Sequence, residues 1–229
     1  MLIAGLQPTT LIDYPDKLAA IVFTHGCQFR CGYCHNPEIV GGQPPQEFSV
    51  ASVLEFLRSR QGLLEGVVVT GGEPTLHPDL ADFLQSVRDL GFAIKLDTNG
   101  TNPERLKEII DRKLVDYLAM DIKAPLAKYN QVTGVKVNPA MITRSIELIK
   151  NSGVSYEFRS TIMPFFHTTE DVTAMAQMIT GAPRYYLQTF RNSGKLLDPT
   201  LASARGFSEI EMTQLARHCR EFVGTCEVR

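Results

Sequence analysis

Short apolar runs alternate with amphipathic stretches along most of the chain. Six of these runs are rich in β-branched or aromatic residues, which is the composition of buried strands. Apolar residues between and after them recur at helical spacing. The predicted strands lie at residues 18–24, 66–70, 92–97, 115–121, 155–162 and 185–190, and the predicted helices at about 49–60, 78–90, 103–112, 138–151, 168–179 and 208–223.

The alternation of strands and helices with short connections predicts an α/β fold with a parallel sheet, right-handed crossovers and both faces covered. Residues 1–17 are broken by Pro8 and Pro15, which predicts an extended lead-in. We expect a single domain over residues 1–229, with a core at about 18–200. Periodicity alone leaves open a partial barrel and a doubly wound open sheet. In both, active residues belong at the C-terminal ends of the strands.

The composition, with 44% apolar and 21% charged residues among 229, is that of a chain that buries one substantial core. The formal net charge is -2 and the charges are interspersed, so no long-range field attracts nucleic acid or anionic lipid. The N-terminus lacks a signal-peptide pattern, and no apolar run approaches the ~20 residues that span a bilayer. We therefore expect a cytoplasmic protein with no nucleic-acid or membrane partner.

Three of the five cysteines fall within eight residues, in the stretch Cys-Gln-Phe-Arg-Cys-Gly-Tyr-Cys. Three thiolates on one loop suit a [4Fe-4S] cluster that keeps one iron without a protein ligand. An open iron of this kind is a place where a substrate can bind. The predicted cluster ligands are Cys27, Cys31 and Cys34.

Two other uses of these cysteines are weaker. A zinc site needs four nitrogen or sulfur ligands, but the chain has no second Cys-x-x-Cys pair, and His35 lies next to Cys34, where its geometry is poor. A disulfide framework conflicts with an odd, sparse set of cysteines and no secretory signal. The remaining pair, Cys219 and Cys226, is expected to consist of structural or surface thiols.

The CxxxCxxC pattern, with Tyr33 before the last cysteine, resembles the signature loop of the radical S-adenosylmethionine (SAM) enzymes. Tyr-Pro-Asp-Lys at 14–17, Cys-His-Asn-Pro at 34–37 and the short length resemble the activating proteins of glycyl radical enzymes, closest to those of anaerobic ribonucleoside-triphosphate reductase. The resemblance runs from about residue 11 to about residue 198. It implies a radical SAM core, which is a partial (β/α)6 TIM-type barrel, with a [4Fe-4S] cluster and SAM as cofactors.

The resemblance also implies a reaction: SAM is cleaved reductively, and a hydrogen atom is then taken from a glycine of a partner enzyme. The partner is a glycyl radical enzyme, and flavodoxin or ferredoxin supplies one electron at low potential. Three alternatives stay open, namely an activating enzyme of pyruvate formate-lyase type, a radical SAM enzyme acting on a small molecule, and an iron-sulfur electron carrier. The carrier is disfavoured because it needs no open iron and no polar groups at the strand ends.

Polar and glycine-rich motifs follow the predicted strands at the ends where active residues are expected. The second strand is followed by Gly-Gly-Glu-Pro, which would be a common turn in isolation, although its glycines let the backbone approach a ligand closely. In the family the matching motif binds the amino group of SAM. Two later strands end in carboxylates, which need a cation or a donor when buried. These residues are Gly71, Gly72, Glu73 and Pro74, then Asp97, Thr98 and Asn99, then Asp121 and Lys123.

A more distant resemblance, to the pyruvate formate-lyase activating enzyme, implies roles for the strand-end residues. Positions matching Asp97, Thr98 and Asp121 help to form a monovalent cation site in that enzyme. Positions matching Asp97, Lys123 and Arg159 contact SAM there. An ordinary salt bridge between these acids and bases is the plain alternative, and both interpretations can hold together.

The sixth strand and the aromatic residues add the last expected contacts. In the same relative a histidine contacts SAM after this strand, and aligning on residues 194–195 places Arg191 opposite it. Gln188 is an equal candidate, and either side chain can hydrogen-bond the ligand. Tyr33 and Phe29 surround the cysteine loop with apolar surface, where they either shield the cluster or adenine or simply fill the core.

Overall fold

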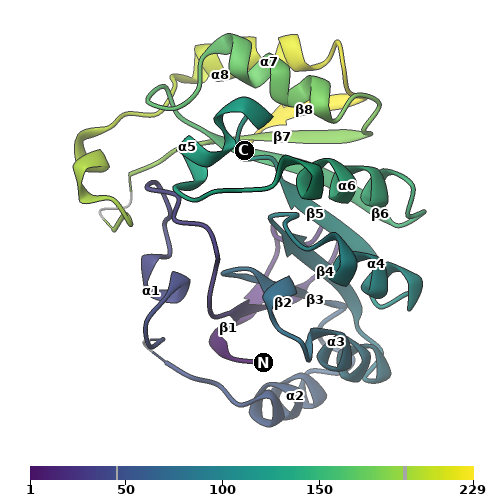
Figure 1. Cartoon of the computed structure of the whole chain (residues 1–229). Coiled ribbons are helices and arrows are strands. Elements are labelled where there is room, and N and C mark those ends of the chain that lie inside the picture. The colour runs from purple at the N-terminus through teal and green to yellow at the C-terminus, as the bar shows by residue number, and fades with distance from the viewer. Residues whose placement is uncertain (45, 193–194) are drawn as a thin grey trace.

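The strands of the described chain form one sheet of eight, in which each strand pairs with the next along the sequence (Figure 1). The computed structural model describes residues 1–44, 46–192 and 195–229. The strands are β1 (Ile3–Thr10), β2 (Ala19–Thr24), β3 (Gly66–Gly71), β4 (Ala93–Thr98), β5 (Tyr117–Asp121), β6 (Ser155–Ile162), β7 (Arg184–Thr189) and β8 (Thr225–Val228). β1 is antiparallel to β2, and every later pairing is parallel.

Helices connect the parallel strands, and side chains such as Ser49, Asn102 and Asn138 cap their first turns. The longer helices are α2 (Val50–Ser59), α3 (Leu80–Asp89), α4 (Pro103–Asp111), α6 (Pro139–Lys150), α7 (Thr169–Met178) and α8 (Glu209–Cys219). Short elements are α1 (Pro37–Val40), α5 (Tyr129–Thr133) and the 3₁₀ turns η1 (Pro74–Leu76), η2 (Leu126–Lys128) and η3 (Pro199–Ser203). None of the helices in the described ranges has the length and apolar character needed to cross a membrane.

Alternate residues of one strand face two different apolar clusters. Val67 and Val69 of β3 pack in the large core together with the helices, whereas Val68 packs with Tyr14 and Tyr117 in a smaller cluster to which no helix contributes. Helices therefore cover the outer face, and the inner face closes on itself as in a barrel. The partial TIM-type barrel is confirmed, and the doubly wound open sheet, which periodicity alone had left open, does not describe this chain.

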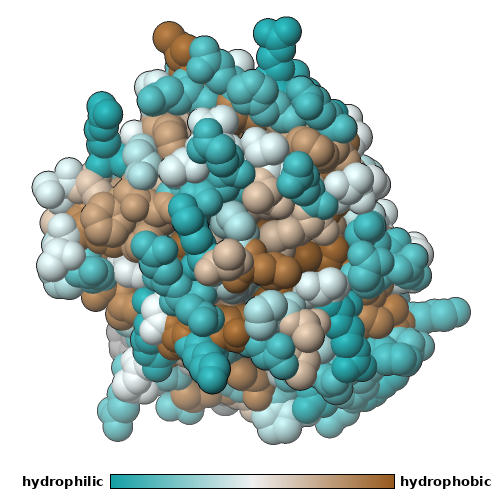
Figure 2. All heavy atoms as spheres, turned by 45° about the horizontal axis from the view of Figure 1, so that its top comes forward, coloured by the Kyte–Doolittle hydropathy of each residue, from teal (hydrophilic) through white to brown (hydrophobic). Residues whose placement is uncertain are grey.

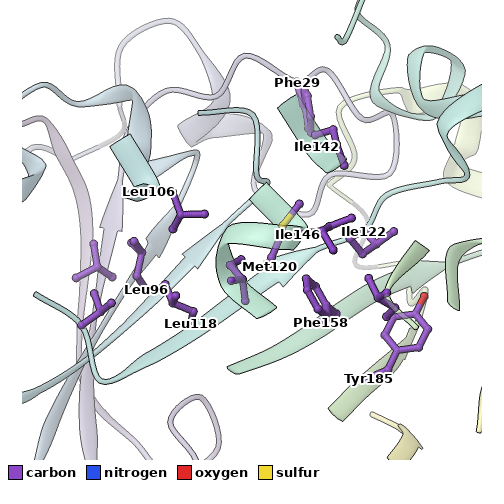
Figure 3. Close-up of a cluster of buried hydrophobic side chains, with 14 of the residues drawn as sticks. Phe29, Leu96, Leu106, Leu118, Met120, Ile122, Ile142, Ile146, Phe158 and Tyr185 are labelled. Atoms are coloured by element: carbon purple, nitrogen blue, oxygen red, sulfur yellow. The ribbon is translucent and has the colours of Figure 1, made fainter. Parts of the chain in front are cut away.

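Apolar side chains fix the strands against the helices (Figure 3). Leu96, Leu118 and Met120 from two neighbouring strands lie with Leu106 of α4 and Ile146 of α6 in one buried layer, and each is at most 2% exposed. Burying a side chain of this size stabilises the fold by about 1.5–3 kcal/mol. The strands are thus held firmly, and their C-terminal ends can position polar side chains.

The two ends of the chain fold differently from the pattern-based expectation. The lead-in is a true strand, β1, whose later residues are exposed because it lies at the edge of the sheet. Helix α8 ends at Cys219 rather than near residue 223, since the chain turns there and the Gly224 N–H donates to the Ala182 carbonyl at 2.8 Å. Cys226 lies on β8, and both cysteines are fully buried, so they are structural and not surface thiols.

Candidate functional site

A cavity opens at the C-terminal ends of the parallel strands. Its volume is about 240 Å³, slightly below the range of about 300–1,000 Å³ typical of ligand pockets. The loop after β2 and the ends of β3, β4, β5 and β6 form its walls. Of the residues expected at the site, all except Pro74, Gln188 and Arg191 line this cavity.

The cysteine loop is held in place by backbone hydrogen bonds to distant parts of the chain. The Arg30 N–H donates to the Thr133 carbonyl at 2.7 Å, and the Asp198 N–H donates to the Gly32 carbonyl at 3.0 Å. The Cys27 N–H donates to the Val40 carbonyl at 3.0 Å. These contacts tie the cysteine loop to three other segments of the chain.

The three thiols of this loop are free and at least partly buried. Burial, together with the nearby Glu73 carboxylate, raises the pKa of Cys27 to about 12, and burial raises the pKa of Cys31 to about 11. Thiols with such pKa values stay protonated near neutral pH and are poor nucleophiles. Binding of iron would displace these protons, so binding of the cluster should depend on pH.

The two glycines after β3 let its backbone approach the cysteine loop. Gly71 has a φ of 117°, and a Cβ on either Gly71 or Gly72 would overlap the backbone of Thr24 or Gly26. The Gly72 N–H donates to the Thr24 carbonyl at 2.8 Å, and the Glu73 N–H donates to the Gly26 carbonyl at 2.7 Å. The glycines therefore serve a close approach of two backbone segments, where the sequence had suggested an approach to a ligand.

The Glu73 carboxylate is buried and fully engaged with protein donors. Its Oε1 accepts from the Thr75 N–H at 3.1 Å, the Thr75 hydroxyl at 2.5 Å and the Thr98 hydroxyl at 2.8 Å. Its Oε2 accepts from the Asn99 N–H at 2.7 Å. Burial raises the pKa of Glu73, and these hydrogen bonds counteract that rise. Glu73 thus ties the end of β3 to the end of β4.

Side chains from β4, β5 and β6 form one chain of ion pairs below the cavity. The Arg159 guanidinium bridges two carboxylates, with Nη1 2.9 Å from Asp97 Oδ2 and Nε 3.0 Å from Asp121 Oδ1. Lys123 Nζ lies 2.9 Å from Asp121 Oδ2, and Lys95 Nζ lies 2.8 Å from Asp97 Oδ1. Every oxygen of the two carboxylates therefore has a cationic donor. We call these five residues the ion-pair chain.

The ion-pair chain keeps its charges despite burial. Burial alone would raise the pKa values of Asp97 and Asp121, but the adjacent cations, Arg159 foremost, hold both below their usual range. The same pairs outweigh burial and raise the pKa values of Lys123 and Arg159. Arg159 Nη2 and two hydrogens of the Lys123 ammonium donate to no protein group among the described residues. Both side chains line the cavity, so these donors are available to a bound anion.

Two aromatic residues of the cysteine loop lie in the cavity wall. The Tyr33 ring packs against Phe166 with 5.8 Å between the ring centroids, and the Phe29 ring packs against Tyr129 at 6.3 Å. The Tyr33 hydroxyl is buried and has no hydrogen-bond partner in the described part of the chain. Burial raises the pKa of Tyr33 above its usual range, so the hydroxyl remains a donor that a bound ligand can satisfy.

Three expected residues lie outside the cavity lining. Pro74 begins the turn η1 and is buried behind the cavity wall, while Gln188 lies on β7. Arg191 has an exposed side chain, but its carbonyl lies 2.5 Å from His35 Nε2 and so helps to hold the cysteine loop. Gly194, on which the alignment of Arg191 depends, lies outside the described residues.

The cavity also contains residues that were not among the expected site residues. Thr161 lies two positions after Arg159 on β6, so alternation along the strand places both on the inner face. Thr70, at the end of β3, also lines the wall. Asn36 and Val40 follow the last cysteine and close one side. Strand alternation could have found the first of these, whereas the others depend on how the loop folds back.

Known proteins resemble this chain in sequence. A family model described as the Radical SAM superfamily matches residues 21–179. The chain belongs to the radical SAM superfamily. A Methanocaldococcus jannaschii protein named as a glycyl-radical enzyme activating enzyme is 29% identical over 237 residues, which cover 100% of this chain and 95% of that protein. The pyruvate formate-lyase-activating enzyme of Clostridium pasteurianum is 28% identical over 184 residues, which cover 77% of this chain and 75% of that protein.

Two solved structures share the fold of this radical SAM protein. Streptococcus suis SuiB bound to a precursor peptide has a TM-score of 0.72 at 14% identity, over 91% of this chain and 48% of SuiB. A radical SAM methyltransferase from Sphaerobacter thermophilus has a TM-score of 0.70 at 17% identity, over 96% of this chain and 68% of the other. The chain thus spans about half the length of SuiB. At these identities the likeness shows the fold alone.

Membership of the superfamily makes the protein an enzyme that uses a [4Fe-4S] cluster and SAM, and the site fits both. Within the described ranges, no three His, Cys, Asp or Glu side chains converge on a point that could hold a single metal ion. Three separated thiols suit a cluster, in which each binds a different iron, better than one zinc ion. The unpartnered hydroxyl of Tyr33 and the free donors of Lys123 and Arg159 suit a ligand that carries acceptors, as SAM does.

Proposed function

We propose that this radical SAM enzyme generates a glycyl radical on a partner protein, and that the partner is anaerobic ribonucleoside-triphosphate reductase. The observation that carries the activase function is the end-to-end match with the M. jannaschii relative, over 100% of this chain and 95% of that protein. Relatives named for small-molecule chemistry match less, such as a Pyrococcus abyssi GTP 3',8-cyclase over 51% of this chain and a Methanopyrus kandleri 7-carboxy-7-deazaguanine synthase over 46%.

The residues of the chain bind and orient the cofactors, which carry the difficult chemistry. When bound, the cluster and SAM supply a reductive bond cleavage that leads to removal of a hydrogen atom from a glycine. In this proposal Cys27, Cys31 and Cys34 hold the cluster, and a flavodoxin or ferredoxin supplies the electron. Lys123 and Arg159 offer their free donors to the SAM carboxylate or hydroxyls. The buried walls exclude water from the reacting atoms.

The rim of the cavity offers an apolar contact for a protein substrate. Phe165 follows β6, at the same end of the barrel as the cavity, and is 66% exposed. Its neighbour Phe166 packs against Tyr33 in the cavity wall, so Phe165 lies beside the opening. Leu76, in the turn after β3, is also exposed. Elsewhere the face drawn in Figure 2 mixes hydrophilic side chains with scattered apolar patches, so a partner has to be recognised locally.

The choice of reductase as partner has a narrower basis. It depends on the resemblance of the segments at 14–17 and 34–37 to activating proteins of that reductase. Tyr14 is buried in the smaller apolar cluster and packs against Tyr117, with 6.1 Å between the ring centroids. Tyr14 therefore has a packing role within this chain, so the partner assignment depends mainly on the segment at 34–37, whose first three residues line the cavity.

An electron paramagnetic resonance experiment tests both parts of the proposal. The reconstituted, reduced enzyme and SAM are mixed anaerobically with the ribonucleotide reductase of the same genome. We expect a glycyl radical doublet that requires SAM. If 5'-deoxyadenosine forms without a doublet, the reductase is the wrong partner, and pyruvate formate-lyase is tested next. If no glycyl radical enzyme of that genome gives a doublet, the activase function is wrong.

A variant at the rim tests the docking contact. Phe165→Ala should raise the concentration of partner needed for half-maximal radical formation, while SAM cleavage without the partner stays at the wild-type rate. Leu63→Ala is the matched control, because Leu63 is 63% exposed and lies in the turn before β3, at the opposite end of the barrel. Equal behaviour of the two variants would place the docking surface elsewhere.

A further inference from the structure

Lys95 is a buried cation directly below the cofactor cavity. It lies on β4 two positions before Asp97, so both side chains point to the inside of the barrel. Lys95 is 1% exposed and does not line the cavity, whereas Asp97 does. Its Nζ lies 2.8 Å from Asp97 Oδ1 and 6.0 Å from the centroid of the Tyr117 ring. A buried lysine is costly unless a partner of opposite charge meets it, and Asp97 is that partner.

The charges around Lys95 leave no place for a metal cation. The ion-pair chain contains three cations and two carboxylates, which gives a net charge of +1. The buried Glu157 carboxylate, which also acts on Arg159, is balanced by its own partner Arg229. Each carboxylate oxygen already accepts from Lys95, Arg159 or Lys123. A metal cation beside these oxygens would be repelled by three fixed positive charges that already hold them.

The Thr98 hydroxyl, which matches a member of the cation site in the pyruvate formate-lyase activating enzyme, makes two hydrogen bonds within the protein. Thr98 Oγ1 donates to Glu73 Oε1 at 2.8 Å and accepts from the Gly100 N–H at 3.1 Å. The residues matching the monovalent cation site of the pyruvate formate-lyase activating enzyme therefore do not fit such an ion in this chain.

We infer that the Lys95 ammonium replaces the monovalent cation of that site in this chain. It holds Asp97 in position from below, and Asp97 in turn orients Arg159, whose free Nη2 faces the cavity. Lys95 is thus a positioning residue for SAM binding that acts through the ion-pair chain. Because the charge is covalently part of the protein, SAM binding does not depend on potassium or sodium. The inference concerns the base of the site and holds whichever substrate the enzyme modifies.

SAM binding in different salts tests this inference. The reconstituted enzyme is dialysed against SAM in potassium chloride, sodium chloride or tetramethylammonium chloride at equal ionic strength. The wild-type dissociation constant should agree within about twofold among the three salts. In Lys95→Met, Asp97 loses one of its two cationic donors and holds Arg159 less firmly. This variant should therefore bind SAM about tenfold more weakly in tetramethylammonium, whose ion is too large to enter.

The decisive result is recovery by a small cation. In Lys95→Met, potassium or sodium should restore most of the lost affinity, because the vacated space next to Asp97 then accepts a metal ion. Potassium should also raise the thermal unfolding temperature of this variant without SAM, and it should not do so in the wild type. Lys107→Met is the matched control, because Lys107 pairs with Asp111 on the surface and should show neither effect.

Two outcomes would overturn the inference. If wild-type SAM affinity falls several-fold in tetramethylammonium, a cation site exists beside Lys95. If Lys95→Met binds SAM equally weakly in all three salts, Lys95 is only a structural ion-pair partner. Should that variant not fold, the wild-type comparison decides, together with Lys95→Arg, which keeps the charge and should remain independent of the salt. None of these measurements uses a partner enzyme, so they can fail while the activase function stands.

Discussion

Removal of the Glu73 carboxylate should weaken the wall between β3 and β4. Two backbone N–H groups, those of Thr75 and Asn99, and the hydroxyls of Thr75 and Thr98 donate to it. In Glu73→Ala the hydroxyls can turn to other acceptors, but the two N–H groups stay buried without a partner. A hydrogen bond to a charged group contributes about 1.5–3 kcal/mol, so the two lost bonds predict a decrease of about 3–6 kcal/mol in the free energy of unfolding.

Glu73→Gln separates the loss of one acceptor from the loss of all of them. The amide oxygen can keep the bonds to Thr75 and Thr98, whereas the NH₂ group then faces the Asn99 N–H and both are donors. One bond is lost instead of two, so the predicted cost is about half, on the order of 1.5–3 kcal/mol. Both variants should also bind SAM more weakly, because Thr98 and Asn99 line the cavity.

Urea unfolding near neutral pH, followed by circular dichroism, measures these costs. Glu55→Ala is the control, since Glu55 is exposed on α2 and a change there should stay within about 0.5 kcal/mol. A cost below about 1 kcal/mol for Glu73→Ala would show that the buried N–H groups find other partners. Equal costs for the two Glu73 variants would show that the charge, rather than the number of acceptors, decides the stability.

Three further predictions concern the cluster, the ion pairs and pH. Cys31→Ala should lose cluster absorbance and SAM cleavage, whereas Cys219→Ala should keep both; retained iron in the first would refute the ligand assignment. Arg159→Lys cannot bridge two carboxylates, so equilibrium dialysis should show SAM affinity about tenfold weaker at unchanged iron content, and wild-type affinity would contradict this. Burial lowers the pKa of His167 below 6.5, and its Nδ1 accepts from the Met163 N–H at 3.2 Å. The folded state therefore binds fewer protons than the unfolded state, so urea midpoints should fall as pH drops from about 7 to about 5, and fall less in His167→Gln.

Much of the fold followed from periodicity, because the buried strands and their helices repeat one local pattern. The six expected strands correspond to β2 through β7, with ends that shift by one or two residues. β1 was missed as a strand because Gly5 and Pro8 interrupt its apolar pattern and its later residues are exposed. β8 was missed because its four residues leave only Cys226 buried, which is too short a signal to distinguish from a loop.

The sequence predicted the site residues that belong to a short motif or a strand end. It did not predict the contacts that depend on how the strands pack in the barrel. The strand-end rule found Asp97, Asp121 and Lys123 because parallel strands bring their carboxyl ends together. Lys95 carried a signal, since a charge between Ile94 and Leu96 in a buried strand needs a partner. Which partner it has depends on the inward direction of its side chain, and that is known only from the barrel.

The anchoring of the cysteine loop has a consequence for the order in which the protein is made. The loop ends near residue 34, but the Arg30 and Gly32 contacts require Thr133 and Asp198. Domains fold as the chain emerges, at about 5–20 residues per second, so the last anchor follows the cysteines by roughly 10–30 s. During that interval the three thiols belong to an unfinished loop. Stable insertion of the cluster therefore waits until the chain is nearly complete, and a ribosome stalled before Asp198 would carry these thiols without their final site.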